Sequence, residues 1–284
     1  MSIHNHSHDH TGKLGLAVLI NVLLTIVQII GGLLSGSLSL IADALHNLSD
    51  AGAIVVAIVA RKIGNRPANE KMTYGYKRAE IIGALINSST LIIIGIYLIF
   101  EAIDKYFNPS PIDGWIVFWV AGVALVIDFA TAVLTYKSGA KSNMNIRAAF
   151  IHNVSDALAS VVVIVAGILI ILYEWYIVDV VATIGISMYV IYHGWLLIKR
   201  ATLILMQAVP EDIKISQIKE SLEQIDGVEE VYHIHVWQLD DDSLFFEGHV
   251  QIESCIFDIR NQLRDMLNSE FKITHSTIEV HLST

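Results

Sequence analysis

The chain has little of the residue types that define several common protein classes. It contains 1 cysteine, 4 prolines and 18 glycines among 284 residues, and charged residues make up only 16% of it. One cysteine cannot build a disulfide scaffold, and so little proline and glycine excludes collagen-like and low-complexity chains. Because Cys255 has no partner within the chain, no intrachain disulfide forms, which is typical of proteins in a reducing compartment.

The chain is instead rich in apolar sequence. Hydrophobic residues make up 54% of it and the mean hydropathy is +0.57, which is typical of a membrane protein. Six apolar stretches each have the roughly 20 residues that a helix needs to cross a bilayer. They cover residues 14–34, 38–60, 79–103, 114–136, 147–172 and 176–198. Because backbone groups in lipid must be paired within their own segment, we predict six transmembrane helices.

The basic residues fall almost entirely on one side of these predicted spans. Loops 35–37, 104–113 and 173–175 contain a single Lys or Arg, whereas the other loops and flanks contain twelve. The single residue is Lys105; the twelve are Lys13, Arg61, Lys62, Arg66, Lys71, Lys77, Arg78, Lys137, Lys141, Arg147, Lys199 and Arg200. By the positive-inside rule the second group faces the cytoplasm. We therefore expect a multi-pass protein of the cell membrane, of the bacterial inner-membrane kind, with both termini cytoplasmic.

The sequence after Pro210 is polar and acidic. Residues 209–284 carry 16 acidic against 5 basic side chains, and such a surface repels nucleic acid, so no nucleic-acid partner is expected. The apolar spacing predicts helix 213–225, strands 228–239 and 243–253, helix 256–270 and strand 276–282. This αββαβ order predicts a small α+β domain of the ferredoxin-like or metallochaperone-like kind.

The chain is therefore divided into three parts. We expect a His-rich cytoplasmic tail over residues 1–13, a six-helix transmembrane domain over 14–208 and a cytoplasmic αββαβ domain over 209–284.

A short motif occurs twice within the apolar region. The segment HNLSDA at residues 46–51 recurs as HNVSDA at 152–157, so that the second predicted span is paired with the fifth. Residues i and i+4 lie on one face of a helix, so His46 and Asp50 point the same way, as do His152 and Asp156. Two such helices facing each other supply two imidazole nitrogens and two carboxylate oxygens, which Zn²⁺ accepts in a tetrahedron. Cu(I) prefers sulfur, and Mg²⁺ and Ca²⁺ prefer oxygen alone.

The aspartates of this motif are costly to place in a membrane. Each costs about 2.5–3.5 kcal/mol at the centre of a span, so a compensating function is expected. For one His–Asp pair, a hydrogen bond that packs helices is an equal alternative. The duplicated pair favours a metal site at the repeat interface, as in transporters whose substrate binds near the midplane.

The sequence resembles the cation diffusion facilitators of the bacterial zinc-efflux type. The resemblance rests on the two HxxxD motifs, on Asp43 in DALHNLSD, on YGYKRAE at residues 74–80, and on the tail motif HVW at 235–237. It implies a homodimer that exports divalent metal in exchange for protons, with His46, Asp50, His152 and Asp156 as metal ligands. A histidine at position 46 resembles the members that prefer zinc, with Cd²⁺ and Co²⁺ as further substrates.

The predicted C-terminal domain holds a second set of candidate ligands. His233, His235, His249 and His281 lie on or beside its predicted strands. The family often binds zinc here, but Tyr232 stands at the usual first-strand position, and His233 faces the other side unless the register changes. A metal site and exposed strand histidines therefore remain equal alternatives.

Three other polar features of the sequence each allow two interpretations. The alternating His4, His6, His8 and His10 form either a weak metal-capturing tract or an ordinary disordered tail. Asp43 either orients a ligand or supports local polar structure. Asp128, inside the fourth predicted span, either lies on a proton route or supports the metal site.

The function predicted from these residues is Zn²⁺/H⁺ antiport. Metal binding needs neutral imidazole, and histidine titrates near pH 6.5, so Zn²⁺ and protons compete for one site, which alternating access then presents to either side. An intramembrane zinc metalloenzyme is the alternative from another class, but no HExxH or GxSxG signature is present, so no enzyme is expected. A zinc sensor without transport would leave the costly intramembrane ligands unexplained.

Overall fold

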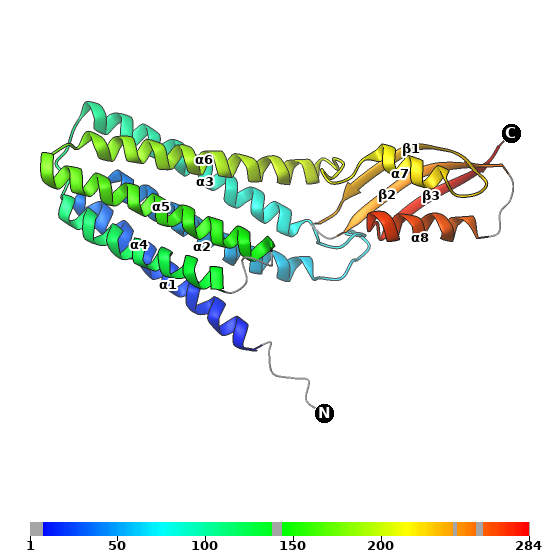
Figure 1. Cartoon of the computed structure of the whole chain (residues 1–284), viewed down its shortest axis with the longest axis horizontal. Coiled ribbons are helices and arrows are strands. Elements are labelled where there is room, and N and C mark those ends of the chain that lie inside the picture. The colour runs from blue at the N-terminus through cyan, green and yellow to red at the C-terminus, as the bar shows by residue number, and fades with distance from the viewer. Residues whose placement is uncertain (1–7, 138–143, 241–242, 254–257, 284) are drawn as a thin grey trace. The chain divides into compact units, whose positions relative to one another are not determined.

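The computed structural model describes residues 8–137, 144–240, 243–253 and 258–283. In this part of the chain, long helices are followed by a small α+β domain, as predicted (Figure 1). The long helices are α1 (His8–Ser35), α2 (Leu38–Gly64), α3 (Ala79–Phe107), α4 (Gly114–Lys137), α5 (Met144–Tyr173) and α6 (Ile177–Leu205). The α+β domain consists of α7 (Ile215–Glu223), β1 (Val228–Gln238), β2 (Leu244–Ile252), α8 (Ile259–Phe271) and β3 (His275–Leu282).

The long helices have the length and composition of membrane spans. Helices α2 to α6 are each apolar and long enough to cross a bilayer, and α1 contributes a shorter apolar segment, Ile20–Ser35, within the described residues. Helix α1 begins at His8, inside the segment 1–13 predicted as a tail, because helical backbone does not require apolar side chains. Residues 1–7, with His4 and His6, lie outside the described residues.

The chain separates into two compact units. The first comprises Met1–Val55 and Asn87–Leu196, and the second comprises Val56–Ile86 and Leu197–Thr284. Helices α2, α3 and α6 therefore contribute one part to each unit.

The first unit is a helical bundle with a close-packed centre. Leu40, Val117 and Val163 are fully buried there, and they come from α2, α4 and α5. Small residues allow α4 and α5 to approach each other closely. A Cβ atom added at Gly114 would lie 2.9 Å from the carbonyl oxygen of Gly167, so neither helix has room for a side chain there.

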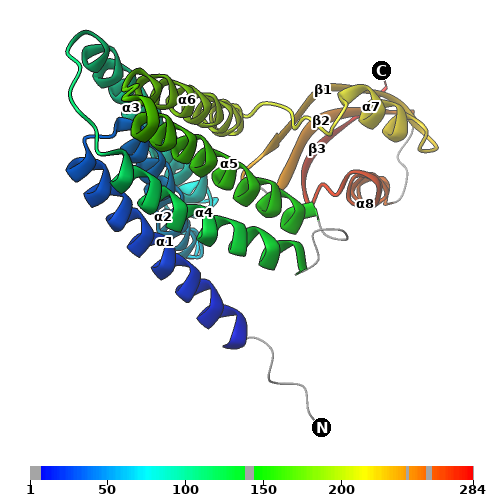
Figure 2. The ribbon, with the colours of Figure 1, turned by 60° about the vertical axis from the view of Figure 1, so that its left-hand side comes forward.

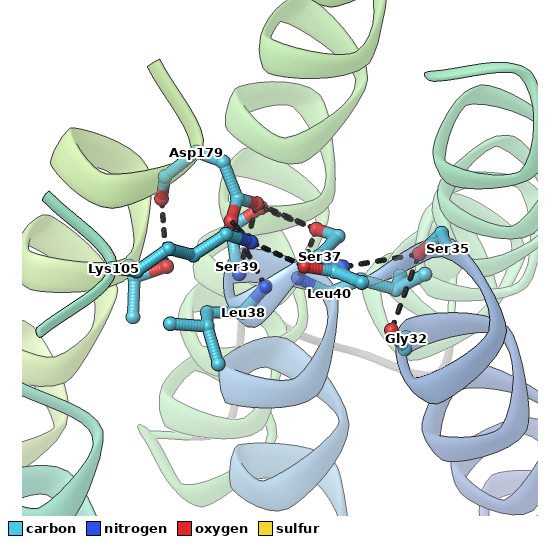
Figure 3. Close-up of polar contacts among 10 residues, drawn as sticks. Gly32, Ser35, Ser37, Leu38, Ser39, Leu40, Lys105 and Asp179 are labelled. Atoms are coloured by element: carbon cyan, nitrogen blue, oxygen red, sulfur yellow. Dashed lines mark hydrogen bonds and ion pairs between the residues drawn. The ribbon is translucent and has the colours of Figure 1, made fainter. Parts of the chain in front are cut away.

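A buried polar network joins three helices at one end of this bundle (Figure 3). Asp179 at the start of α6 accepts hydrogen bonds from Ser37 Oγ at 2.6 Å and Ser39 Oγ at 2.7 Å. It also accepts from the backbone N–H of Leu38 at 2.9 Å, at the first turn of α2. Lys105 of α3 forms an ion pair with the same carboxylate at 3.1 Å. Asp179 therefore satisfies the unpaired donors at the N-terminus of α2 from a neighbouring helix.

The second unit contains a three-stranded sheet with the strand order β1-β2-β3 (Figure 2). Strand β2 pairs antiparallel with β1 and parallel with β3. Helices α7 and α8 contact each other, and their buried residues Ile218 and Leu263 pack with Val236 and Phe246 of the strands. Both helices thus cover one face of the sheet and form a two-layer domain.

The other face of the sheet carries polar and aromatic side chains. Trp237 and His249 alternate with the core residues Val236 and Val250, so they lie on the side away from the helices. Strand β1 contains a bulge between Tyr232 and His235, where His233 has a φ of 53°. The extra residue places both Tyr232 and His233 between the core positions Val231 and Ile234.

Candidate metal centre

Two His–Asp pairs from α2 and α5 meet inside the first unit. His46 and Asp50 are one turn apart on α2, and His152 and Asp156 are one turn apart on α5, so each pair lies on one helix face. His46 Nε2 lies 3.2 Å from Asp156 Oδ1, and His152 Nε2 lies 3.1 Å from Asp50 Oδ2. The contacts between the two helices are thus shorter than those within each helix, which are 3.7 Å and 3.6 Å.

The four side chains form a closed cycle in which imidazole and carboxylate alternate. Each imidazole Nε2 faces both carboxylates, at nitrogen–oxygen distances from 3.1 to 3.7 Å. A tetrahedral Zn²⁺ with ligands at about 2.0 Å has ligand–ligand edges of roughly 3.3 Å. The nitrogen–oxygen distances of the cycle are close to these edges, but Asp156 faces His46 through Oδ1 and His152 through Oδ2.

The cycle is more open on the side of His152. Three of the four residues each place one ligand atom within 4.8 Å of the other two: His46, Asp50 and Asp156. The fourth residue, His152, has its ring centroid 6.1 Å from that of His46. His46 is 6% exposed and Asp156 8%, while the side chain of His152 is 46% exposed. Closing a tetrahedron therefore requires His152 to move toward His46, from the accessible side of the site.

An apolar cavity of about 550 Å³ reaches the centre from between α5 and α6. His46 lines it together with Ser155, Tyr189 and a wall of valine, leucine and isoleucine side chains. The ring of Tyr189 stands edge-on to His46, with centroids 6.2 Å apart. One ligand of the centre is thus in contact with a space large enough for water.

Asp43 lies one turn before His46 and is 1% exposed. Its Oδ2 accepts a hydrogen bond of 2.6 Å from Gln28 Nε2 of α1, and Asn47 Nδ2 donates to Gln28 Oε1 at 3.1 Å. Within the described residues, Asp43 Oδ1 has no hydrogen-bond partner. Of the two roles left open by the sequence, support of local polar structure fits this geometry, because the hydrogen bond of Asp43 leads to Gln28 of α1 rather than to a candidate ligand.

Asp128, which the sequence singled out, and His193 are two further titratable groups on the long helices. Asp128 is 7% exposed and accepts a hydrogen bond of 3.0 Å from Ser160 of α5, one turn after Asp156. His193 is exposed and packs against Tyr189, with ring centroids 4.4 Å apart. Asp128 is therefore attached to the helix that carries two candidate ligands, whereas His193 lies at the surface.

The open face of the sheet gathers the histidines of the C-terminal domain. His249 Nδ1 lies 3.1 Å from His281 Nε2, and Glu279 lies 3.8 Å from His249 and 3.5 Å from His281. Donor atoms of these three residues lie within 4.8 Å of one another. The bulge provides the register change that His233 needs, because its ring centroid is 5.1 Å from that of His249.

The other predicted members of this set are placed differently. His235 Nε2 lies 3.4 Å from His233 Nε2, so His235 lies beside the cluster next to His233. Tyr232 stacks beside His249 and His281 and covers the two imidazoles. Glu279 was not named from the sequence, although it is two residues before His281 on β3 and the strand period places both on one face.

Comparison with known proteins identifies the family. Residues 14–206 match the model described as the cation efflux transmembrane domain, and residues 210–281 match the cytoplasmic domain of cation efflux proteins. The chain belongs to the cation efflux family. The predicted resemblance, the fold class and the expectation of a transporter rather than an enzyme are thereby confirmed.

Several curated relatives match the chain almost from end to end. The cadmium, cobalt and zinc/H(+)-K(+) antiporter of Bacillus subtilis is 35% identical over 98% of this chain and 91% of its own length. The metal cation efflux system protein CzcD of Cupriavidus metallidurans is 32% identical, over 98% and 90% respectively. The zinc transporter ZitB of Escherichia coli is 30% identical, over 97% and 92%. This cation efflux protein is thus a multi-pass membrane protein related to transporters of zinc, cadmium and cobalt.

Proposed function

We propose that this protein exports Zn²⁺ from the cytoplasm in exchange for protons, by alternating access to the His46–Asp50–His152–Asp156 site. The observation that carries the proposal is the alternating cycle of two imidazoles and two carboxylates, with nitrogen–oxygen distances of 3.1 to 3.7 Å. Relatives named as zinc transporters and as a zinc/H(+)-K(+) antiporter support the choice of substrates. Cd²⁺ and Co²⁺ can bind the same nitrogen and oxygen donors, so we expect them as further substrates.

The cycle explains why protons and zinc exclude each other. A proton on either imidazole is shared with the facing carboxylates, and the same nitrogen and oxygen atoms are the zinc ligands. Zinc therefore displaces protons when it binds from the neutral cytoplasm. When the site faces the other side, protons arriving on the imidazoles remove zinc ligands and release the metal.

The membrane orientation and assembly follow from the same proposal. The twelve basic residues support a cytoplasmic location for both termini and the C-terminal domain. The match to the cytoplasmic domain of cation efflux proteins supports a homodimer. Zinc binding by His249, Glu279 and His281, with His233 as a fourth ligand, would let this domain respond to cytosolic zinc.

Metal flux into sealed vesicles tests the function. Purified protein in vesicles with an imposed pH gradient is expected to move Zn²⁺ against the proton flux, and Asp50→Ala and Asp156→Ala are expected to abolish transport while the protein stays folded. Asp104→Ala is the control, because Asp104 is an exposed acid far along α3 from the site. Full activity of either site variant would contradict the four-ligand model, and zinc binding without any flux would favour a sensor.

A further inference from the structure

We propose that Asp43 is a proton-binding site of the transport cycle, separate from the four metal ligands. The proposal rests on the proposed Zn²⁺/H⁺ exchange and adds a proton carrier that never touches the metal.

Asp43 is buried with only half of its carboxyl group satisfied. The side chain is 1% exposed, and Gln28 Nε2 donates to Oδ2 at 2.6 Å. Oδ1 is buried and has no hydrogen-bond partner in the described part of the chain. The orientation of Gln28 is fixed by Asn47, which donates to Gln28 Oε1 at 3.1 Å, so Gln28 offers Asp43 only its amide N–H group.

A neutral carboxylic acid fits this environment better than a carboxylate. An ionised carboxylate that is buried needs several donors or a cation, and the structure provides one donor from an uncharged amide. A proton on Oδ1 makes that atom a hydroxyl and leaves Oδ2 as the carbonyl oxygen that accepts from Gln28. The arrangement therefore stores one proton on Oδ1 when no metal is present.

The surroundings of Asp43 link this proton to the metal site. The charged and titratable groups that act on it are His46 on its own helix, Asp128 of α4 and Asp156 of α5, while α1 presents the neutral Gln28. The two carboxylates share this buried region with Asp43. A divalent cation bound one turn away favours an ionised carboxylate, because charges interact strongly in a buried, low-dielectric region.

The proposed cycle conserves charge and protons. When Zn²⁺ binds to His46, Asp50, His152 and Asp156, the O–H bond of Asp43 breaks and the proton leaves to solvent. When Zn²⁺ departs, Asp43 takes up a proton again. Each zinc ion is thus exchanged for one proton more than the imidazoles alone provide.

Proton release on zinc binding tests this directly. Titration calorimetry of the full-length protein with Zn²⁺, in buffers that differ in ionisation enthalpy, counts the protons released per metal. Asp43→Asn keeps the size of the side chain and an acceptor for Gln28, and it mimics the protonated acid. We expect Asp43→Asn to bind zinc but to release about one proton fewer than wild type, with Asp104→Asn as an unaffected control.

Infrared difference spectroscopy provides a second measurement that does not depend on the asparagine variant folding. Wild type is expected to lose the C=O stretch of a protonated carboxylic acid when Zn²⁺ is added, Asp43→Glu to shift this band, and Asp128→Asn to retain it. An unchanged proton count in Asp43→Asn, or a band that Asp43→Glu leaves in place, would overturn the assignment. Wild-type vesicles that show no Zn²⁺/H⁺ exchange would contradict the proposed function instead, and the proton count on binding distinguishes the two failures.

Discussion

At the scale of single residues, position 46 is where metal preference should be decided. Replacing His46 by Asp changes the donor set from two nitrogens and two oxygens to one nitrogen and three oxygens. Oxygen donors suit harder or larger cations, and the shorter side chain widens the site. We expect His46→Asp to raise Cd²⁺ and Mn²⁺ uptake relative to Zn²⁺ and to weaken competition by protons, because one of the two imidazoles that can bind a proton is lost.

Uptake of the three metals by wild type and His46→Asp in matched vesicles measures this selectivity. His193→Asp is the control, because His193 is an exposed intramembrane histidine that packs on Tyr189 outside the cycle. If the uptake ratios of wild type and His46→Asp were the same, position 46 would not select the metal.

The individual residues also show what the sequence could and could not predict. The spacing of His46 and Asp50 fixes their common helix face, so the intramembrane set could be named from the motif alone. The position of Glu279 beside His281 could be predicted from the two-residue period of a strand, because Glu279 precedes His281 by two residues. The approach of His233 to His249 could not be predicted, since it depends on a bulge with positive φ that no local residue pattern requires.

At the scale of secondary-structure elements, Asp179 should be a major source of stability for the bundle. Its buried carboxylate holds the first turn of α2 and the ammonium group of Lys105 together (Figure 3). Breaking a buried ion pair by removing one partner costs about 3–5 kcal/mol. We therefore expect Asp179→Ala to lower the free energy of unfolding by about that amount, measured by denaturant unfolding in detergent.

A matched control for this prediction is Asp113, which caps α4. Asp113 Oδ1 accepts from the backbone N–H groups of Trp115 and Ile116 at 3.0 and 3.3 Å, but these bonds are exposed to solvent. Loss of such a cap costs about 1 kcal/mol, so Asp113→Ala should be clearly milder than Asp179→Ala. Equal losses in the two variants would show that Asp179 acts only as a helix cap.

The elements themselves could be predicted closely, because apolar length and strand alternation determine them. The helices extend past several predicted spans, for example to Gly64 in α2 and Leu205 in α6, since helical hydrogen bonding continues into polar sequence. The polar network at Asp179 could not be predicted, because it joins residues 140 positions apart and no repeat marks it.

At the scale of the whole molecule, the second unit connects the C-terminal sheet to the start of a membrane helix. The ring of Tyr74, in the segment before α3, stands edge-on to Trp237 and Phe245, with centroids 6.0 and 5.5 Å apart. The Arg78 guanidinium lies 5.8 Å from the centroid of Trp237. Because α3 begins at Ala79, the segment that contacts the sheet lies directly before this helix.

Trp237 takes part in two of these three contacts, those with Tyr74 and Arg78, so its removal should weaken communication between the two domains. Each aromatic pair contributes about 0.5–1.5 kcal/mol beyond its buried area, and the cation–π contact about 0.5–1 kcal/mol. The Lys77–Asp240 ion pair at 3.4 Å is partly exposed and cannot replace them. We expect Trp237→Ala to reduce the dependence of the transport rate on cytoplasmic-side zinc.

The two domains should remain intact in this variant, which separates loss of coupling from loss of folding. Trp237 is not a member of the His249–Glu279–His281 cluster, so zinc binding by the C-terminal domain should persist, and so should binding at the intramembrane site. Trp115→Ala is a control for the loss of a tryptophan outside these contacts, because Trp115 is exposed at the start of α4, whereas Trp237 is buried. Transport rates over a range of zinc concentrations, measured beside zinc binding for both variants, decide the question. If Trp237→Ala responded to zinc as wild type does, α3 would receive no signal through this aromatic contact, and the C-terminal domain would have to act on transport through another path, such as assembly of the dimer.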